Sequence, residues 1–340
     1  MQKELTEGRL LDAKGNLAEA GFGYRLVRDY RRKDIKAGKL RIKEWDYYYI
    51  GNPLFGLALT IDDNSYMSMA SVTFFDFAEK KDYTKSPITF FSLGRVGLPS
   101  SSSGGTTKIK GRGYSLSFYN DGDTRHLVGH MDNLTKGKNL SFDLVLAETN
   151  RDSMVIATPF KKKKHFYYNQ KINLLEATGK VIFGDKTYDM EGSLGVLDWG
   201  RGVWTYRNTW YWSSLNARYH GKRIGFNLGY GFGDTSAATE NMFFYNDRAY
   251  KLGEVEFNIP KDPKTGKDCF MCDWTFTSPD NSVQLTFKPI LDRYSGTSLV
   301  IIKSIQHQVF GKFSGSITVE GKKIEFEDLL GFAEKVRNNW

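Results

Sequence analysis

The residues best suited to chemistry lie in one segment, residues 192–214, which holds four of the seven tryptophans. Asp198 and Arg201 supply opposite charges in this segment. A carboxyl group among aromatic rings is poorly solvated, so its charged form is disfavoured and it can donate a proton near neutral pH. We therefore predict that Asp198 and Arg201 are catalytic residues. Rings that can line an apolar pocket or stabilise a positive charge are predicted to bind ligand: Trp199, Trp204, Trp210 and Trp212. An aromatic core with an Asp–Arg pair that holds a turn is the alternative.

Residues 224–233 alternate large apolar side chains with glycines, so one face of the predicted strand is almost bare. Several glycines on one strand face indicate that a ligand, or another strand at a tight corner, approaches the backbone closely. Tyr230 on the apolar face is predicted to bind ligand. Asp234 and Glu240 follow the strand, where polar groups surround the mouth of a barrel, and join the predicted ligand-binding residues. A strand-like run follows instead of a long helix, so the glycines do not form a dinucleotide-binding motif.

The elements that must hold these residues are mainly strands. Alternation with a period of two recurs along the chain, most clearly over residues 308–319, and tight-turn residues separate the runs. Only residues 327–337 resemble a short helix, which Gly331 interrupts. This pattern predicts antiparallel sheets closed into barrels or sandwiches. We place the boundary between an N-terminal unit (1–190) and a C-terminal unit (191–340) where a predicted hairpin gives way to the tryptophan-rich segment.

The composition excludes several classes of function. Hydrophobic residues make up 40% and charged residues 26% of the 340 residues, as in an ordinary globular protein. The formal net charge is +9, but the one dense basic run, residues 161–164, is interpreted as a solvated turn, so no nucleic-acid partner is predicted. No stretch approaches the roughly 20 apolar residues of a transmembrane helix. The first residues lack a secretory signal, and we expect a cytoplasmic protein.

Metal and phosphate chemistry are also not expected. Cys269 and Cys272 form a single C-x-x-C pair without a second pair of ligands, and the five histidines include no zinc-binding helix motif. The loop over residues 99–107 is rich in serine and glycine but lacks the lysine of a phosphate-binding loop. It is either a lid over a cavity or a plain connection. We predict no metal and no cofactor.

Five segments resemble the bacterial family called domain of unknown function 2804: residues 43–48, 166–171, 198–202, 229–241 and 331–334. That family is similar to the lipocalin-like carotenoid hydratases and to natural-product cyclases with two lipocalin-like barrels. The resemblance implies two lipocalin-like antiparallel β-barrels packed into one unit, with few helices, a ligand cavity and a reaction without a cofactor. In the hydratases an aspartate near a Trp-Gly pair donates a proton, and Asp198 is the matching position; here Trp199 follows it directly.

Together these observations predict a cofactor-independent lyase, hydratase or isomerase. Its partner would be a small hydrophobic or amphipathic molecule, isoprenoid or polyketide-like, held in a barrel cavity. A non-catalytic binding or carrier protein with the same pocket is the alternative. A carbohydrate-binding module would need exposed aromatic platforms, whereas rings within continuous strands fit an interior better.

Overall fold

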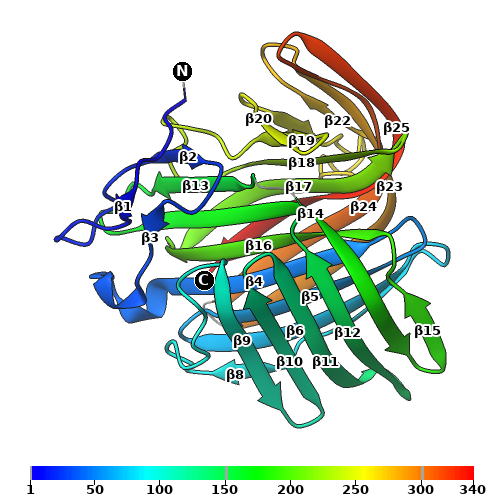
Figure 1. Cartoon of the computed structure of the whole chain (residues 1–340), viewed down its shortest axis with the longest axis horizontal. Helices are drawn as coiled ribbons and strands as arrows, with labels where there is room; N and C mark the ends of the chain where they lie inside the picture. Colours follow the sequence, from blue (N-terminus) through cyan, green and yellow to red (C-terminus); the bar gives the residue numbers. More distant parts are fainter. Residues whose placement is uncertain (1, 150–151, 300–301) are drawn as a thin grey trace.

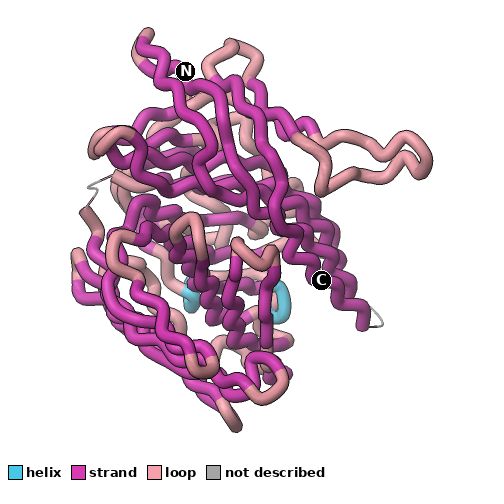
Figure 2. Tube along the Cα trace, turned by 90° about the vertical axis from the view of Figure 1, so that its right-hand side faces the viewer, coloured by secondary structure: helices cyan, strands magenta, loops and turns pink. Residues whose placement is uncertain are grey.

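The computed structural model describes residues 2–149, 152–299 and 302–340. Almost all of its regular structure is strand, and the helical segments of this described part are two short 3-10 turns, η1 (Arg32–Asp34) and η2 (Lys39–Arg41). Figure 2 shows these turns as small insertions in a body of strands. The prediction of a mainly β chain is confirmed.

The first sheet has fourteen strands, and its main path runs β7-β6-β5-β4-β16-β14-β12-β11-β10-β9. Every pairing within it is antiparallel. Its strands are β2 (Gly21–Gly23), β4 (Ile42–Gly51), β5 (Phe55–Asp63), β6 (Met67–Asp76), β7 (Lys81–Lys85), β8 (Ile88–Phe90), β9 (Gly104–Gly111), β10 (Tyr114–Asp121), β11 (Thr124–Thr135), β12 (Lys138–Ala147), β13 (Met154–Pro159), β14 (Phe166–Phe183), β15 (Lys186–Asp189) and β16 (Ser193–Val203).

The second sheet has nine strands in the order β20-β19-β18-β17-β25-β24-β23-β22-β21, again antiparallel throughout. They are β17 (Arg207–Tyr219), β18 (Lys222–Tyr230), β19 (Met242–Tyr245), β20 (Arg248–Lys251), β21 (Glu256–Asn258), β22 (Trp274–Thr277), β23 (Val283–Leu299), β24 (Ile302–Val319) and β25 (Lys322–Asn339). A small parallel pair, β1 (Gly8–Arg9) with β3 (Arg28–Asp29), lies outside both sheets.

Each sheet curls around its own apolar interior, and a third apolar cluster lies between the two sheets. The predicted pair of lipocalin-like antiparallel barrels packed into one unit is thus confirmed. Strands β14 and β16 cross the middle of the molecule, where β14 contacts β17 and β18 and β16 contacts β17 (Figure 1). Because side chains alternate along a strand, these strands present one face to the first barrel and the other to the second sheet.

The chain changes sheets later than the sequence suggested. Strand β16 pairs with β4 and β14 of the first sheet over its whole length, and the second sheet begins at Arg207. The expected boundary at residues 190 and 191 therefore separates β16 from both of its partners. The break falls between Val203 and Arg207.

The candidate helix at residues 327–337 is a strand. It forms part of β25, which lies between β17 and β24, and Gly331 pairs with Gly311 of β24. Pairing on both edges outweighs the weak helical pattern, since a strand's preferences depend strongly on its context. Within the described residues, no helix is long and apolar enough to cross a membrane.

Candidate functional site

Strand β16 places Asp198 on the face that looks toward the second sheet. Its Oδ2 lies 2.7 Å from Nζ of Lys171 on the neighbouring β14, and its Oδ1 accepts a hydrogen bond of 2.6 Å from Nδ2 of Asn169. Lys171 and Asp198 are register partners, so their alternation forces both side chains onto the same face. Asp198 is thus part of a buried ion pair with a lysine.

Arg201 lies on the opposite face of β16, inside the first barrel. Its Nη2 lies 2.9 Å from Oδ1 of Asp46, and its other donors reach the carbonyl oxygens of Trp45, Gly200 and Pro99. Residues three positions apart on a strand point to opposite sides. The alternative of an Asp198–Arg201 pair that holds a turn is therefore not seen, because each residue pairs with another partner on its own face of β16.

The Lys171–Asp198 pair is covered by aromatic and amide groups of the second sheet. Nζ of Lys171 lies 3.9 Å from the ring centroid of Trp212, a cation–π contact. Nε1 of Trp212 donates to Oδ1 of Asn227 at 2.7 Å, and Nδ2 of Asn227 donates to the carbonyl oxygen of Glu240 at 2.8 Å. This chain of contacts joins the first sheet to the segment after β18.

Glu240 brings a carboxyl group into the same interior. It is 2% exposed, and among the described residues neither of its carboxyl oxygens has a hydrogen-bond partner. Burial raises the pKa of Glu240 to about 7; Lys171 acts against this, and Asp198 adds to it. A Cβ at Gly229 would overlap Oε1 of Glu240, so the bare strand face makes room for this carboxyl group.

A second carboxyl group, Glu334 on β25, lies in the same region. Its Oε1 accepts from Nε1 of Trp210 at 3.1 Å and its Oε2 from Nε2 of Gln306 at 3.0 Å. Burial raises the pKa of Glu334 to about 7, while these hydrogen bonds and Lys171 lower it. Two buried carboxyl groups, each with a pKa raised to about 7, thus lie near enough to the Lys171–Asp198 pair to feel its charges.

Tyrosine and amide groups complete the surroundings. Within the described part of the chain, the buried hydroxyl group of Tyr167 and Oδ1 of Asn169 have no hydrogen-bond partner. Burial, followed by the charge of Glu240, raises the pKa of Tyr167. We call the following residues the inter-sheet site: Tyr167, Asn169, Lys171, Asp198, Trp210, Trp212, Glu240 and Glu334. Buried polar atoms are rarely left unpaired, so these atoms are candidates for hydrogen bonds to water or to a polar group of a ligand.

The predicted ligand-binding residues separate into three regions. Trp204, Trp210 and Trp212 belong to the apolar cluster between the sheets, together with the inter-sheet site. Trp199 lies inside the first barrel, where the guanidinium of Arg201 is 4.2 Å from its ring centroid. Tyr230 lies inside the second barrel and stacks on Tyr211 with centroids 4.6 Å apart. Trp199 and Tyr230 thus face interiors other than that of Asp198.

The two acids expected at a barrel mouth also differ from each other. Asp234 is exposed, and its Oδ1 accepts from the backbone NH of Ser236 at 3.0 Å, which stabilises a turn. Glu240 is buried between the sheets instead of lying at a mouth. The strand-end argument failed for Glu240 because the chain turns back from β18 and packs against Gly229.

The sequence interpretation missed Lys171, Glu334, Asn169 and Tyr167. All four lie in the segments 166–171 and 331–334, which carry the family resemblance. Tyr167, Asn169 and Lys171 alternate along β14, a signal that they share a face. That this face meets Glu334 depends on how the two sheets pack, which no local pattern reveals.

The loop over residues 99–107 closes on the first barrel. The carbonyl oxygen of Pro99 accepts hydrogen bonds from Arg201, and Oγ of Ser102 donates to Oε1 of Gln170. Oγ1 of Thr107 donates to Oδ2 of Asp46 at 2.5 Å. These contacts place the loop over the structural network of Arg201, away from the inter-sheet site.

Metal ligands are not gathered in the described residues, where no three His, Cys, Asp or Glu side chains form a possible metal site. Cys269 and Cys272 are joined by a disulfide in the segment between β21 and β22. Lys171 pairs with Asp198, so Glu240 and Glu334 have no ion-pair partner among the described residues, and carboxyl groups of this kind can take part in proton transfer.

Two curled antiparallel sheets with a buried polar site between them define a two-barrel protein of the lipocalin-like type. The chain belongs to the family described as domain of unknown function (DUF2804), whose model matches residues 2–340. No protein of curated function matches the sequence at a significant level.

Solved structures share this fold at very low sequence identity. An AttH-type protein from Nitrosomonas europaea is 10% identical, with 92% of this chain and 98% of that one covered and a TM-score of 0.56. Kievitone hydratase from Nectria haematococca is 12% identical, with 100% of this chain and 97% of that one covered and a TM-score of 0.52. These likenesses support the two-barrel architecture.

Proposed function

We propose that the protein is a cofactor-independent hydratase, lyase or isomerase that moves protons on a small apolar molecule held at the inter-sheet site. The observation that carries this proposal is the pair of buried carboxyl groups, Glu240 and Glu334, each with a pKa of about 7. An acid or base works best when its pKa lies near the working pH. Apolar rings around these groups suit an isoprenoid or polyketide-like guest.

Glu240 is the best proton donor of the site. Among the described residues its carboxyl oxygens have no hydrogen-bond partner, so they can bond a substrate without giving up an existing contact. Asp198 uses both oxygens on Lys171 and Asn169, which suits it to orient the lysine. Glu334 is held by Trp210 and Gln306, as a base with a fixed position should be. Glu240 thus takes the acid role that the sequence assigned to Asp198.

Hydration illustrates how these groups would act. Glu240 gives its proton to one carbon of a substrate C=C bond, whose π electrons form the new C–H bond. The oxygen of a water molecule attacks the other carbon and loses a proton to Glu334. Ring faces such as that of Trp210 stabilise the positive charge between these steps. The reverse sequence is a dehydration, and proton loss from carbon without water attack is an isomerisation. The hydratase named among the similar folds supports this reaction class.

The test is isotope incorporation. The protein is incubated in H₂¹⁸O with a panel of isoprenoid and polyketide-like alkenes, and mass spectrometry follows gain of labelled water or loss of water. We expect turnover of at least one class and a fall of roughly 10²-fold in Glu240→Gln, the usual scale of general acid catalysis. Glu325→Gln, a substitution of an exposed acid on the same strand as Glu334, is the matched control. Unchanged turnover in both Glu240→Gln and Glu334→Gln would contradict the proposal.

Asp198→Asn tests the acid role proposed from the sequence. If Asp198 were the donor, its substitution would remove turnover while Glu240→Gln retained it. A carrier with the same pocket is the second candidate, supported by the ring cluster of Trp204, Trp210 and Phe232. A carrier would return every bound alkene unlabelled and unchanged.

A further inference from the structure

A second candidate site lies at the mouth of the second barrel, on the other side of β25 from Glu334. Lys335 is the next residue, so its side chain points into the second barrel. It forms a cross-strand row with His307 of β24 and Tyr294 of β23, and it also pairs with Tyr211 of β17. An ammonium group that is 7% exposed therefore stands at the end of an aromatic barrel interior.

The segment between β21 and β22 closes over this row. Asp268 of that segment accepts from Nζ of Lys335 at 2.6 Å and from Nζ of Lys261, and its Oδ2 lies 3.9 Å from Nη2 of Arg337. Burial opposes the charge of Asp268, but the hydrogen bonds from Lys261 and Lys335 hold its pKa below the usual value. Three cations thus converge on one carboxylate supplied by the chain itself.

Space and an apolar wall lie beside these charges. A pocket of about 570 Å³ is lined by Lys261, Asp268, Phe270, Tyr294, His307 and Lys335, among others. Phe270 stacks on His307 with centroids 3.7 Å apart and planes at 9°, and Tyr294 is 60% exposed. The pocket offers a flat aromatic surface next to a set of positive charges.

The basic character extends beyond the pocket. A neighbouring hollow of about 400 Å³ shares Ile305 and Arg337 with it and adds Arg207 and Lys303. Lys267 also lines the first pocket. Asp268 is the one acid among the lining residues of the two hollows, so positive charge is in excess.

The closing segment is held to the barrel by aromatic packing and ion pairs. Phe270 packs on His307, whose Nδ1 lies 2.7 Å from Oδ2 of Asp292, and Asp268 pairs with Lys335. The disulfide of Cys269 and Cys272 fixes the turn that carries both Asp268 and Phe270. A ligand anion would replace the contacts of Asp268, while the ring contacts of Phe270 with Trp274 and His307 hold the segment in place.

We propose that the barrel mouth binds a small organic anion with a flat apolar body, whose carboxylate takes the place of the Asp268 carboxylate. The body of the ligand lies against Tyr294 and Ile305, and Lys335 and Arg337 hold its charge. Charge-assisted hydrogen bonds of this kind are about twice as strong as neutral ones. This site is separate from the inter-sheet site and does not depend on the proposed function.

The test uses 2-naphthoate as the anionic probe and naphthalene-2-methanol as its neutral counterpart, with binding to the full chain followed by calorimetry. We expect saturable binding of 2-naphthoate and binding of the alcohol weaker by roughly tenfold or more, the scale of a hydrogen bond to a charged group. Asp268→Asn should bind 2-naphthoate more tightly than the wild type, because the internal competitor is removed. Equal binding of probe and alcohol, or no binding of the probe, would overturn the proposal.

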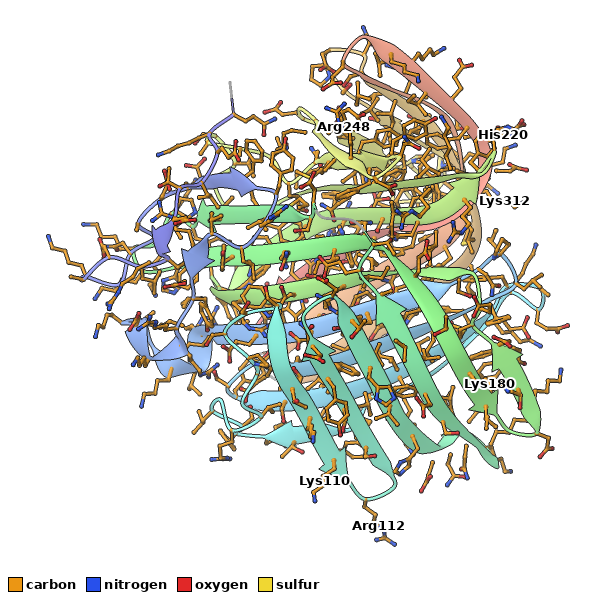
Figure 3. The ribbon with its side chains drawn as sticks, in the orientation of Figure 1. Lys110, Arg112, Lys180, His220, Arg248 and Lys312 are labelled. Atoms are coloured by element: carbon orange, nitrogen blue, oxygen red, sulfur yellow. A yellow bond between two sulfur atoms is a disulfide. The ribbon has the colours of Figure 1, made fainter. Side chains whose placement is uncertain are left out.

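Substitutions of pocket residues test where 2-naphthoate binds. Lys335→Met should weaken binding of 2-naphthoate by roughly tenfold or more. The control is Lys312→Met on the same sheet; Lys312, labelled in Figure 3, is half-exposed, pairs with Asp328 at 3.5 Å and does not line the pocket. Arg337→Gln changes an exposed pocket residue and keeps the test valid if Lys335→Met does not fold. If the pocket variants bind 2-naphthoate as tightly as Lys312→Met, the barrel mouth is not the site.

Discussion

The two faces of β16 differ in whether their buried charged groups have hydrogen-bond partners. Toward the first barrel, the guanidinium of Arg201 and the carboxylate of Asp46 are satisfied by each other, by carbonyl oxygens and by Thr107. Toward the second sheet, the Lys171–Asp198 pair is joined by Glu240, whose oxygens have no partner in the described residues. The Arg201–Asp46 pair is thus satisfied within the protein, whereas the carboxyl group of Glu240 is not.

This difference indicates a structural role for the Arg201 face and a functional role for the Glu240 face. A satisfied buried network fixes the loop over residues 99–107 and gains nothing from a ligand. An unsatisfied one costs stability, and natural proteins keep such costs mainly where activity requires them. The account therefore predicts opposite signs for substitutions on the two faces: loss of stability on the Arg201 face and gain at Glu240.

The largest effect is expected for Arg201→Met. It leaves the buried Asp46 carboxylate without its cation, and breaking a buried pair in this way costs about 3–5 kcal/mol. Denaturant unfolding measures this loss, with Arg207→Met at an exposed position as the control. A loss below about 1 kcal/mol, the scale of a surface ion pair, would place Arg201 outside any structural network.

Glu240→Gln should instead stabilise the folded protein, and only at higher pH. The pKa of Glu240 is raised from 4.5 to about 7 on folding, so the folded state binds the additional proton between these values. The stability that this proton binding contributes to the folded state is fully present below pH 4.5 and is lost as pH rises through about 7. At about 1.4 kcal/mol per pH unit, Glu240→Gln should be about 3 kcal/mol more stable than the wild type at pH 8 and equal to it at pH 4. A variant that is less stable at pH 8 would show that the carboxylate is well paired.

Double-mutant cycles should show which partner Asp198 has. Asp198→Asn combined with Lys171→Met should give a coupling energy of roughly 0.5–3 kcal/mol, because the two groups form one ion pair. Asp198→Asn combined with Arg201→Met should be additive within about 0.5 kcal/mol, since the groups lie on opposite faces and share no partner. Coupling between Asp198 and Arg201 would restore the Asp198–Arg201 pair that the sequence left open as an alternative.

A further effect concerns the space between Gly229 and the carboxyl group of Glu240. A methyl group at Gly229 would overlap Oε1 of Glu240, so Gly229→Ala should destabilise the wild type by about 1–3 kcal/mol, the usual cost of overpacking. In a Glu240→Ala background the same change should cost less, since one obstruction is gone. An equal cost in both backgrounds would mean that the Tyr211 carbonyl oxygen, the other close neighbour, sets the limit.

Local patterns predicted the sheets but only part of the site. Alternation and turn residues indicated antiparallel barrels, and the glycine-bare face of β18 correctly indicated a close approach. The approaching group, Glu240, returns from beyond the strand's end, so local alternation could not identify it. Asp198 and Arg201 could have been separated by counting, because positions three apart on a strand face opposite sides.

The meeting of Lys171, Glu334 and Asp198 had no sequence signal of its own. It requires the register of β14 with β16, which a β-bulge shifts between Ile172 and Leu175, and the packing of two sheets. The tryptophans were also grouped wrongly. Trp199 and Trp204 are five residues apart, an odd separation that turns them to opposite faces and into different cores.

The titration of Glu240 and Glu334 tests the central claim most directly. Protein labelled with ¹³C at the glutamate side-chain carboxyl carbon is titrated by NMR, and the two resonances are assigned from Glu240→Gln and Glu334→Gln. The account predicts that both groups titrate with apparent pKa values near 7, and that each substitution shifts the remaining one because the groups interact. Titration of both near the ordinary value of 4.5, without mutual influence, would contradict a proton-transfer site between the sheets.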